Sequence, residues 1–208
     1  MEKLYERLAR LVEETSKEIN ITAIRDYEDI LNKHILDSFM PQKLMPEVFV
    51  DGSTVLDLGT GGGFPGLPLA IAFPNCKFVL MDSTRKKLDV VDQFAKELNL
   101  QNVETVWARA EIEDLTAKKK VAGKKSTLGQ YDIVVARSVS YLPKLLETVK
   151  PLLKPNGIFI AYKLLDEDEI KEGNLKADQI HMKKIGEHKY ILPKNEQERV
   201  LLVYGLLG

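Results

Sequence analysis

The apolar residues of this chain follow two different periods. Short apolar runs recur through its middle, and between them apolar residues return every three or four positions, as in amphipathic helices. Near the end, apolar and polar residues alternate with period two, which is typical of half-buried strands. The predicted strands begin at residue 54, with Val55, Leu56 and Leu58 as the apolar run, and continue at 77–81, 103–107, 131–136, 158–162, 182–192 and 199–205.

Helices occupy the intervals between these strands. They are predicted from about Pro65 onward and over 84–98, 142–153 and 166–177, and a turn at 154–157 leads into the fifth strand. Five successive strand-and-helix steps followed by a hairpin predict an α/β fold. The expected sheet has seven strands, mostly parallel, with a C-terminal antiparallel hairpin and helices on both faces.

Two more helices are predicted ahead of the first strand. Residues 1–18 carry a leucine-rich stripe at helical spacing, and the same spacing resumes over 26–39. Pro41 and Pro46 then mark the approach to the first strand. The stripes indicate that both helices pack onto the rest of the chain.

Length and composition fit a single domain. The chain has 208 residues and is 44% hydrophobic, which is ordinary for one globular α/β domain. We expect one domain over 1–208, with a helical extension at 1–45 and the core at 46–208, working as a monomer. The net charge of −1 gives no global basic signature, so a nucleic-acid partner would have to meet a local basic patch.

Several other classes of protein are disfavoured. The first residues are charged throughout, and no apolar run approaches the ~20 residues that span a bilayer. Cys76 is the only cysteine, so no internal disulfide can form, and the histidines at 34, 181 and 188 lack the spacing of metal ligands. We therefore expect a cytoplasmic protein with no membrane contact and no metal.

A glycine-rich turn after the first strand is the strongest candidate for a binding site. Gly59, Gly61 and Gly63 allow positive φ and close approach of a ligand to the backbone. Gly61-x-Gly63-x-x-Gly66 formally matches a dinucleotide fingerprint, but it starts several residues after the strand. Asp57 would repel a pyrophosphate and suits the ammonium group of S-adenosylmethionine (SAM). The turn thus favours SAM over NAD, with a ligand-free structural turn as the remaining interpretation.

An acidic residue also ends the second strand. Asp82 follows the glycine turn by about 20 residues, where both kinds of cofactor domain bind ribose hydroxyls. Asp82 and Ser83 also begin a helix, so Asp82 could instead be an N-cap, and the two roles are compatible. The sequence predicts ribose binding at this position.

Charged side chains are predicted near the same edge of the sheet. Arg85, Lys86 and Lys87 stand in the first turn of a helix, against its macrodipole. This mild cost points to contact with a phosphate, although a solvated charge run is the commoner explanation of such a pattern. His34 and Asp37 lie three residues apart and can form a polar pair, either facing a substrate or simply on the surface of the helix.

A series of short motifs resembles one family over nearly the whole chain. The motifs are NITAI at 20–24, HILDS at 34–38, DLGTGGGFPGLPLAI at 57–71, DSTRKK at 82–87, RAE at 109–111 and ARSV at 136–139. They are similar to those of the bacterial small-subunit rRNA guanine-N7 methyltransferases known as RsmG or GidB. The first two motifs are specific to that family, because a generic methyltransferase does not need them. The lysine-rich segment 117–125 departs from the resemblance, since a short connector is expected there; it either contacts RNA backbone or is a solubilising insertion.

The resemblance implies a Rossmann-like, SAM-dependent methyltransferase that releases S-adenosylhomocysteine. The implied partner is 16S rRNA, as free RNA or within the small ribosomal subunit or its assembly intermediate. The candidate cofactor-binding residues, from the resemblance and the glycine turn together, are Asp57, Gly59, Gly61, Phe64, Asp82, Ser83, Ala110, Glu111 and Arg137.

The implied reaction requires little acid–base chemistry. N7 of guanine has an unprotonated lone pair, so alignment of the two partners matters more than a general base. We assign no catalytic base, and Arg137 is the candidate positioning residue for the cofactor or the RNA. Basic residues expected around the cofactor mouth are Arg25, Lys33, Arg85, Lys86 and Arg109. The alternatives are a methyltransferase acting on a small molecule or a protein, and a non-catalytic nucleotide-binding module.

Overall fold

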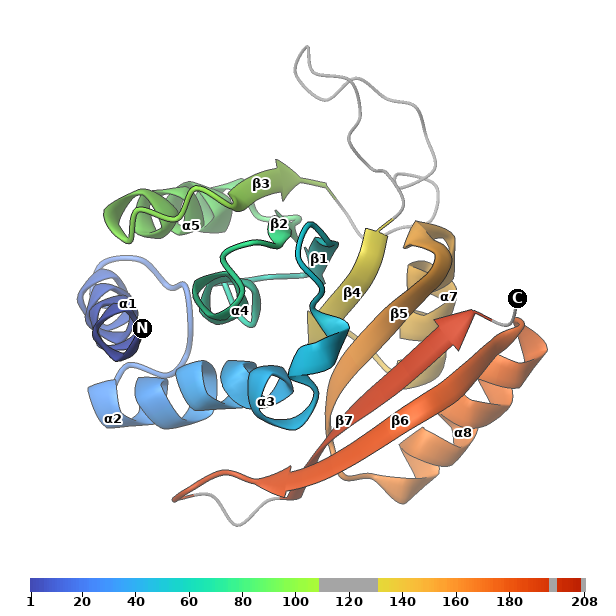
Figure 1. Cartoon of the computed structure of the whole chain (residues 1–208). Helices are drawn as coiled ribbons and strands as arrows, with labels where there is room; N and C mark the ends of the chain where they lie inside the picture. Colours follow the sequence, from blue (N-terminus) through green and yellow to red (C-terminus); the bar gives the residue numbers. More distant parts are fainter. Residues whose placement is uncertain (109–130, 195–197, 207–208) are drawn as a thin grey trace.

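The computed structural model describes residues 1–108, 131–194 and 198–206, and its strands form one seven-stranded sheet in the order β3-β2-β1-β4-β5-β7-β6 (Figure 1). Strands β1 to β5 pair in parallel, whereas β7 is antiparallel to both β5 and β6. The predicted α/β fold with a C-terminal hairpin is confirmed. The strands are β1 (Thr54–Leu58), β2 (Lys77–Asp82), β3 (Val103–Trp107), β4 (Tyr131–Arg137), β5 (Leu153–Leu164), β6 (Met182–Ile191) and β7 (Glu198–Leu206).

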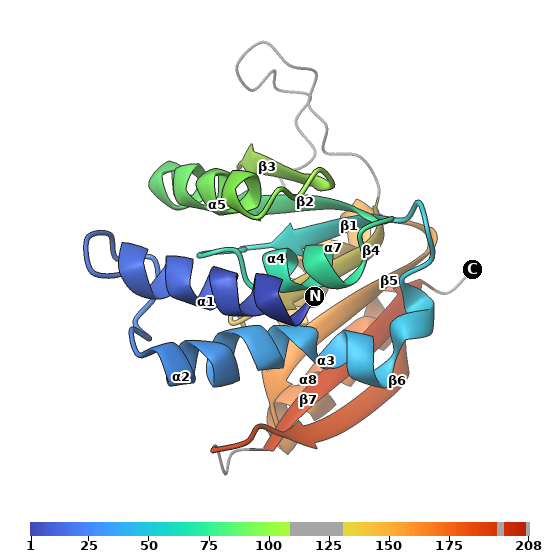
Figure 2. The same cartoon turned by 60° about the vertical axis from the view of Figure 1, so that its left-hand side comes forward.

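Helices cover both faces of this sheet, and the alternation of side chains along the strands explains why. In β1, Val55 belongs to one buried hydrophobic cluster and Leu56 to another on the opposite face. The first cluster includes α1 to α5 and the second includes α7 and α8 (Figures 1 and 2). The helices are α1 (Glu2–Thr15), α2 (Tyr27–Ile30), α3 (Asp37–Leu44), α4 (Gly66–Ala72), α5 (Arg85–Glu97), α7 (Leu142–Val149) and α8 (Glu167–Gln179), with 3-10 turns at Pro46–Val48 and Lys150–Leu152.

The second N-terminal helix is longer and less regular than the sequence predicts. Between α2 and α3 the backbone forms a π-helical turn, Leu31–Leu36, so a helical stretch runs from Tyr27 to Leu44. Pro41 lies inside α3, so the helix extends to Leu44, beyond its predicted end at residue 39. Although proline removes one helical N–H, Met40 and Pro41 are both buried. Tertiary packing therefore keeps the segment helical where local propensity would end it.

The predicted turn at 154–157 is also corrected. These residues lie within β5, where the pairing with β4 shifts register: Tyr131 is opposite Leu153, and Ile133 is opposite Ile158. Asn156 adopts φ of 65° there. The extra residues form a bulge in a continuous strand. Because turn-forming residues occur in bulges and in loops, the sequence alone does not distinguish the two.

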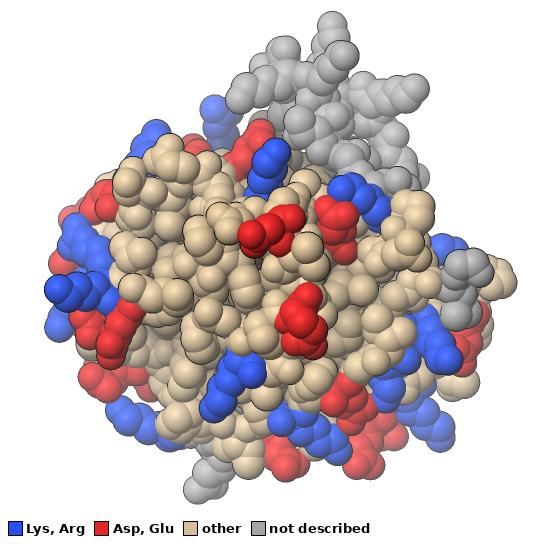
Figure 3. Space-filling model, viewed as in Figure 1, with Lys and Arg blue, Asp and Glu red and all other residues tan. Residues whose placement is uncertain are grey.

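The described surface carries mixed charge. On the face shown in Figure 3, Lys and Arg side chains are interspersed with Asp and Glu toward the edges, and several acidic side chains lie near the centre among uncharged residues. This distribution agrees with the net charge of −1 and means that a polyanion would depend on local groups. None of the described helices is both long enough and apolar enough to cross a bilayer.

Candidate cofactor and substrate site

The glycine turn leaves the carboxyl end of β1 and is tied to the end of β2. The backbone N–H groups of Gly59 and Thr60 both donate to the carbonyl of Met81, at 2.9 and 2.8 Å. Gly59, Gly61 and Gly63 have φ of 74°, 58° and 95°, the left-handed region that glycine adopts without steric cost. A Cβ built on Gly61 would meet nothing within 4 Å. The backbone at Gly61 is therefore open to a ligand.

Asp57 stabilises this turn through hydrogen bonds. Its side chain is fully buried, and Oδ2 accepts hydrogen bonds from Thr60 Oγ1 at 2.6 Å and Gly66 N at 2.7 Å. Gly66 permits this approach, because a Cβ there would lie 2.7 Å from the same oxygen. Burial raises the pKa of Asp57 to about 7, although both hydrogen bonds oppose the shift. Oδ2 thus holds the turn in shape, whereas Oδ1 is buried without a hydrogen-bond partner among the described residues. The contact between Asp57 and a cofactor ammonium stays a prediction.

Asp82 connects the glycine turn to α5. One carboxylate oxygen accepts from Gly61 N at 2.9 Å and the other from Thr84 N at 2.8 Å. Thr84 is the N-cap residue of α5, so Asp82 forms a turn ahead of the helix and is not itself the cap. Ser83 is exposed, and its carbonyl accepts from Trp107 Nε1 at 2.9 Å. Because Asp82 is only partly buried and each carboxylate oxygen can accept twice, it retains acceptor capacity for a hydroxyl group.

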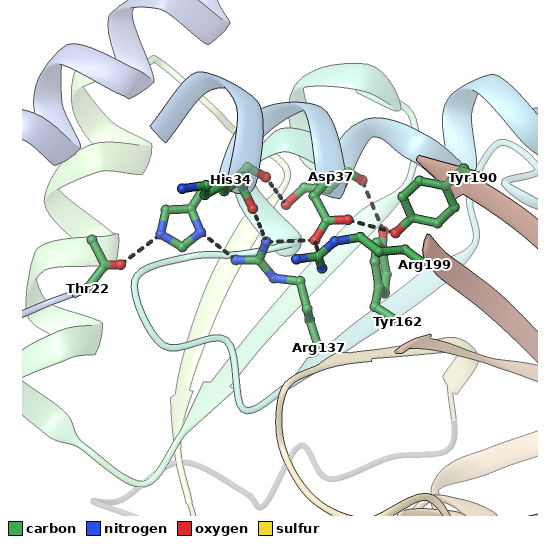
Figure 4. Close-up of polar contacts among 9 residues, drawn as sticks. Thr22, His34, Asp37, Arg137, Tyr162, Tyr190 and Arg199 are labelled. Carbon is green, nitrogen blue, oxygen red and sulfur yellow. Dashed lines mark hydrogen bonds and ion pairs between the residues drawn. The ribbon is translucent and has the colours of Figure 1, made fainter. Parts of the chain in front are cut away.

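Arg137 extends from the end of β4 into a polar cluster beneath the N-terminal helices (Figure 4). Its guanidinium donates to Lys33 O at 2.9 Å, to Asp37 Oδ2 at 3.1 Å and to His34 Nδ1 at 2.8 Å. Arg199 donates to the same Asp37 oxygen at 3.1 Å, and Tyr190 donates to the other at 2.7 Å. Asp37 is fully buried. Two arginines thus share one buried carboxylate, which leaves an excess of positive charge.

His34 joins this cluster to the glycine turn. Its ring stacks on Phe64, with centroids 4.7 Å apart and planes 14° from parallel, and its Nε2 is 2.7 Å from Thr22 Oγ1. The expected direct pair with Asp37 is not formed, since both ring nitrogens have other partners and Arg137 lies between the two residues. Burial and the charges of Arg137 and Arg199 lower the pKa of His34 to about 3. The imidazole is therefore neutral at physiological pH.

A cavity of about 680 Å³ lies between the segment after α1 and the start of α5. Lys86 and Lys87 line it, opposite Asn20, with Glu18 and Asp89 also in the wall. It adjoins Thr84 and hence the turn that Asp82 holds. Lys86 and Lys87, two of the predicted basic residues, thus lie near the turn that Asp82 holds. The carboxylates of Glu18 and Asp89 line the same cavity.

The structure brings together some of the predicted site residues and leaves others outside its description. Gly59, Gly61, Phe64, Asp82 and Arg137 meet at the carboxyl edge of β1, β2 and β4. Arg109, Ala110, Glu111 and the lysine-rich segment 117–125 lie outside the described residues. Sequence reasoning missed Arg199 and Tyr190, which contact Asp37 across 162 and 153 positions of the chain. No local sequence pattern predicts contacts between residues so far apart in the chain.

Comparisons with known proteins agree with this geometry. A family model described as GidB, rRNA small subunit methyltransferase G, matches residues 1–200. The ribosomal RNA small subunit methyltransferase G of Fusobacterium nucleatum subsp. nucleatum is 37% identical over 204 residues, covering 97% of this chain and 81% of that protein. The protein of the same name from Deinococcus radiodurans is 38% identical, covering 97% and 76%. Among solved structures, a methyltransferase from Pyrococcus furiosus has the same fold, with a TM-score of 0.63 at 16% identity over 96% of each chain.

The buried neutral state of His34 predicts a pH dependence of stability. Its pKa is lowered to about 3 in the folded chain, so between pH 6.5 and 3 the unfolded chain binds a proton that the folded chain does not. The contribution of His34 to stability is then lost as pH falls below 6.5, and comparison with a His34 variant separates it from groups such as Asp57, whose raised pKa acts in the opposite direction. From pH 7 to 5, wild type should lose about 2 kcal/mol more free energy of unfolding than His34→Gln, measured by urea denaturation. His188→Gln, which removes a partly exposed histidine, is the control and should follow wild type. Equal pH dependence in all three proteins would contradict the buried neutral assignment.

Proposed function

The chain belongs to the rRNA small subunit methyltransferase G family, and we propose that it transfers the methyl group of SAM to N7 of a guanine in 16S rRNA of the small ribosomal subunit. Family membership supports methylation of small-subunit rRNA, and the motif resemblance supports the N7 position. The observation that carries the proposal is the open glycine turn, held by Met81 and Asp82 and adjoining Phe64. The proposed substrate supports a cytoplasmic location. We also propose that residues 1–208 act as one methyltransferase domain.

The residues at the turn fit a nucleoside cofactor such as SAM. The open space beside Gly61 admits close approach of a ligand, and Asp82 keeps acceptor capacity toward ribose hydroxyls. When bound, SAM supplies an electrophilic methyl group on a sulfonium centre. Gly59 and Gly61 would form the floor of the cofactor site, with Phe64 and Ser83 at its borders. Asp57 would fix the shape of the turn through Oδ2, which leaves Oδ1 as its acceptor toward the cofactor ammonium.

Arg137 is suited to orienting an anionic part of the bound partners. The described contacts use three of the five N–H groups of its guanidinium, so two remain for a ligand. The neighbouring Arg199 makes the cluster net positive against the single carboxylate of Asp37. A carboxylate or phosphate that entered here would offset that excess charge. Because Arg137 is fixed by Lys33, His34 and Asp37, it would hold such a group in one orientation.

Guanine N7 needs no deprotonation, which agrees with the chemistry of the described site. His34 is held neutral with both ring nitrogens hydrogen-bonded, and Asp57 is enclosed beneath the turn. Neither group is placed to remove a proton from a substrate. Catalysis would instead depend on alignment in a protected pocket, which can supply roughly 7–11 kcal/mol in oriented model reactions.

The SAM site can be tested with a matched pair of glycine variants. Gly61 and Gly52 both have positive φ, of 58° and 86°, and a Cβ on either meets no atom within 4 Å. Alanine should therefore impose a similar backbone strain of about 1–2 kcal/mol at both positions. Only Gly61→Ala should weaken SAM binding, by on the order of tenfold or more in calorimetry, whereas Gly52→Ala should bind SAM like wild type. Equal SAM affinity in the two variants would place the cofactor elsewhere.

The reaction is tested by incubating the protein with methyl-labelled SAM and small-subunit rRNA from a strain that lacks this gene. Mass spectrometry of the digested RNA should show 7-methylguanosine at one position, and single-turnover rates should vary little across the neutral pH range, since no base must be deprotonated. Label found only in a small molecule or a protein would contradict the proposal. A methylated exocyclic amine, with a rate that titrates near pH 7, would show that N7 is not the acceptor.

A further inference from the structure

The NITAI motif at 20–24 contains none of the cofactor-binding residues assigned above, yet it lies against the cofactor turn. The carbonyl of Ile21 is 3.4 Å from the position that a Cβ on Gly62 would take. The Ile21 side chain is 4% exposed and belongs to the core cluster, which anchors the segment. Asn20 lines the cavity that Lys86 and Lys87 also line. The motif therefore stands between the cofactor turn and a cavity of mixed charge.

Hydrogen-bond accounting fixes the chemical role of Thr22 within this motif. A guanidinium can only donate, so the contact from Arg137 Nη2 requires His34 Nδ1 to be an acceptor. In a neutral imidazole the proton is then on Nε2, which donates to Thr22 Oγ1 at 2.7 Å. The backbone N–H of Ile24 donates to the same oxygen at 3.1 Å. Figure 4 shows Thr22 at the end of this chain of contacts.

These two contacts leave Thr22 as a hydrogen-bond donor only. A hydroxyl group has two acceptor positions and one proton, and His34 and Ile24 occupy both acceptor positions. Within residues 1–108, 131–194 and 198–206, no group accepts the remaining proton. Thr22 is only half-buried, so the proton is available to a ligand at the mouth of the site.

A hydroxyl group that can only donate a hydrogen bond favours binding of guanine over binding of adenine. On the edge that carries N7, guanine presents O6 as a second acceptor, whereas adenine presents an N6 amino group, which donates. N7 must keep its lone pair for the methyl group, so recognition has to come from the neighbouring atom. We propose that the Thr22 hydroxyl donates to O6 of the target guanine and selects it over adenine. This inference rests on the proposed function, because it assumes a guanine acceptor.

The test combines two Thr22 variants with two substrates. Thr22→Val keeps the shape but removes the hydroxyl group, and Thr22→Ser restores it. The substrate is small-subunit rRNA ligated so that the methylated position carries either guanine or 2-aminopurine, which lacks O6. Thr22→Val should reduce kcat/KM on guanine RNA by about 10- to 100-fold, as expected for an unmatched hydrogen-bonding group. Thr22→Ser should stay within about threefold of wild type, since it retains the donor.

The 2-aminopurine RNA separates recognition from a structural role. Wild type should lose activity on it, whereas Thr22→Val should show no further loss relative to its rate on guanine RNA. Full activity of Thr22→Val on guanine RNA would overturn the inference, and so would equal proportional losses from the analogue in both proteins. A loss of SAM affinity in Thr22→Val would also overturn it, because the hydroxyl would then serve the cofactor site. Absence of 7-methylguanosine from the wild-type reaction would instead refute the proposed function together with this inference.

Discussion

The carboxylate of Asp37 joins three parts of the chain that are far apart in sequence. It is fully buried in the helical extension and is paired with Arg137 at the end of β4 and with Arg199 and Tyr190 in the C-terminal hairpin. Burying a carboxylate is costly unless charges and hydrogen bonds surround it, and here both are present. Removing it would leave two partly buried arginines without their anion, and breaking buried pairs of this kind typically costs about 3–5 kcal/mol.

The consequences of this interaction reach the cofactor turn. Because Arg137 is held by Asp37, its other N–H groups are directed at Lys33 O and at His34, which fixes the tautomer of the imidazole. His34 then stacks on Phe64 of the glycine turn and donates to Thr22. The π-helical turn that carries Lys33 and His34 is a feature often found at functional sites. The helical extension and the cofactor edge are thus parts of one polar arrangement, which explains why the motifs at 20–24 and 34–38 accompany the glycine motif.

The sequence could predict the elements that depend on local pattern. Strand order and the hairpin follow from apolar periodicity and from the rules for strand connections, and the glycine turn was recognisable from its composition. The helix end near Pro41 and the bulge at 154–157 were misjudged, because core packing and strand pairing override local turn signals. The part of Asp57 in shaping the turn could not be predicted from the sequence for a related reason. An acidic residue before a glycine turn can face a ligand or hold the turn, and only the structure shows that Oδ2 accepts from Thr60 and Gly66.

The central claim is that Asp37 couples the extension to the cofactor turn, and amide hydrogen exchange of Asp37→Asn tests it most directly. Asp29→Asn is the matched control, since Asp29 lies on the same helical stretch but forms a partly exposed pair with Lys33. Asp37→Asn should lose protection together at 20–24 and at 59–64, whereas Asp29→Asn should leave both segments unchanged. Loss of protection confined to 27–44 in Asp37→Asn, with 59–64 as slow to exchange as in wild type, would contradict the account.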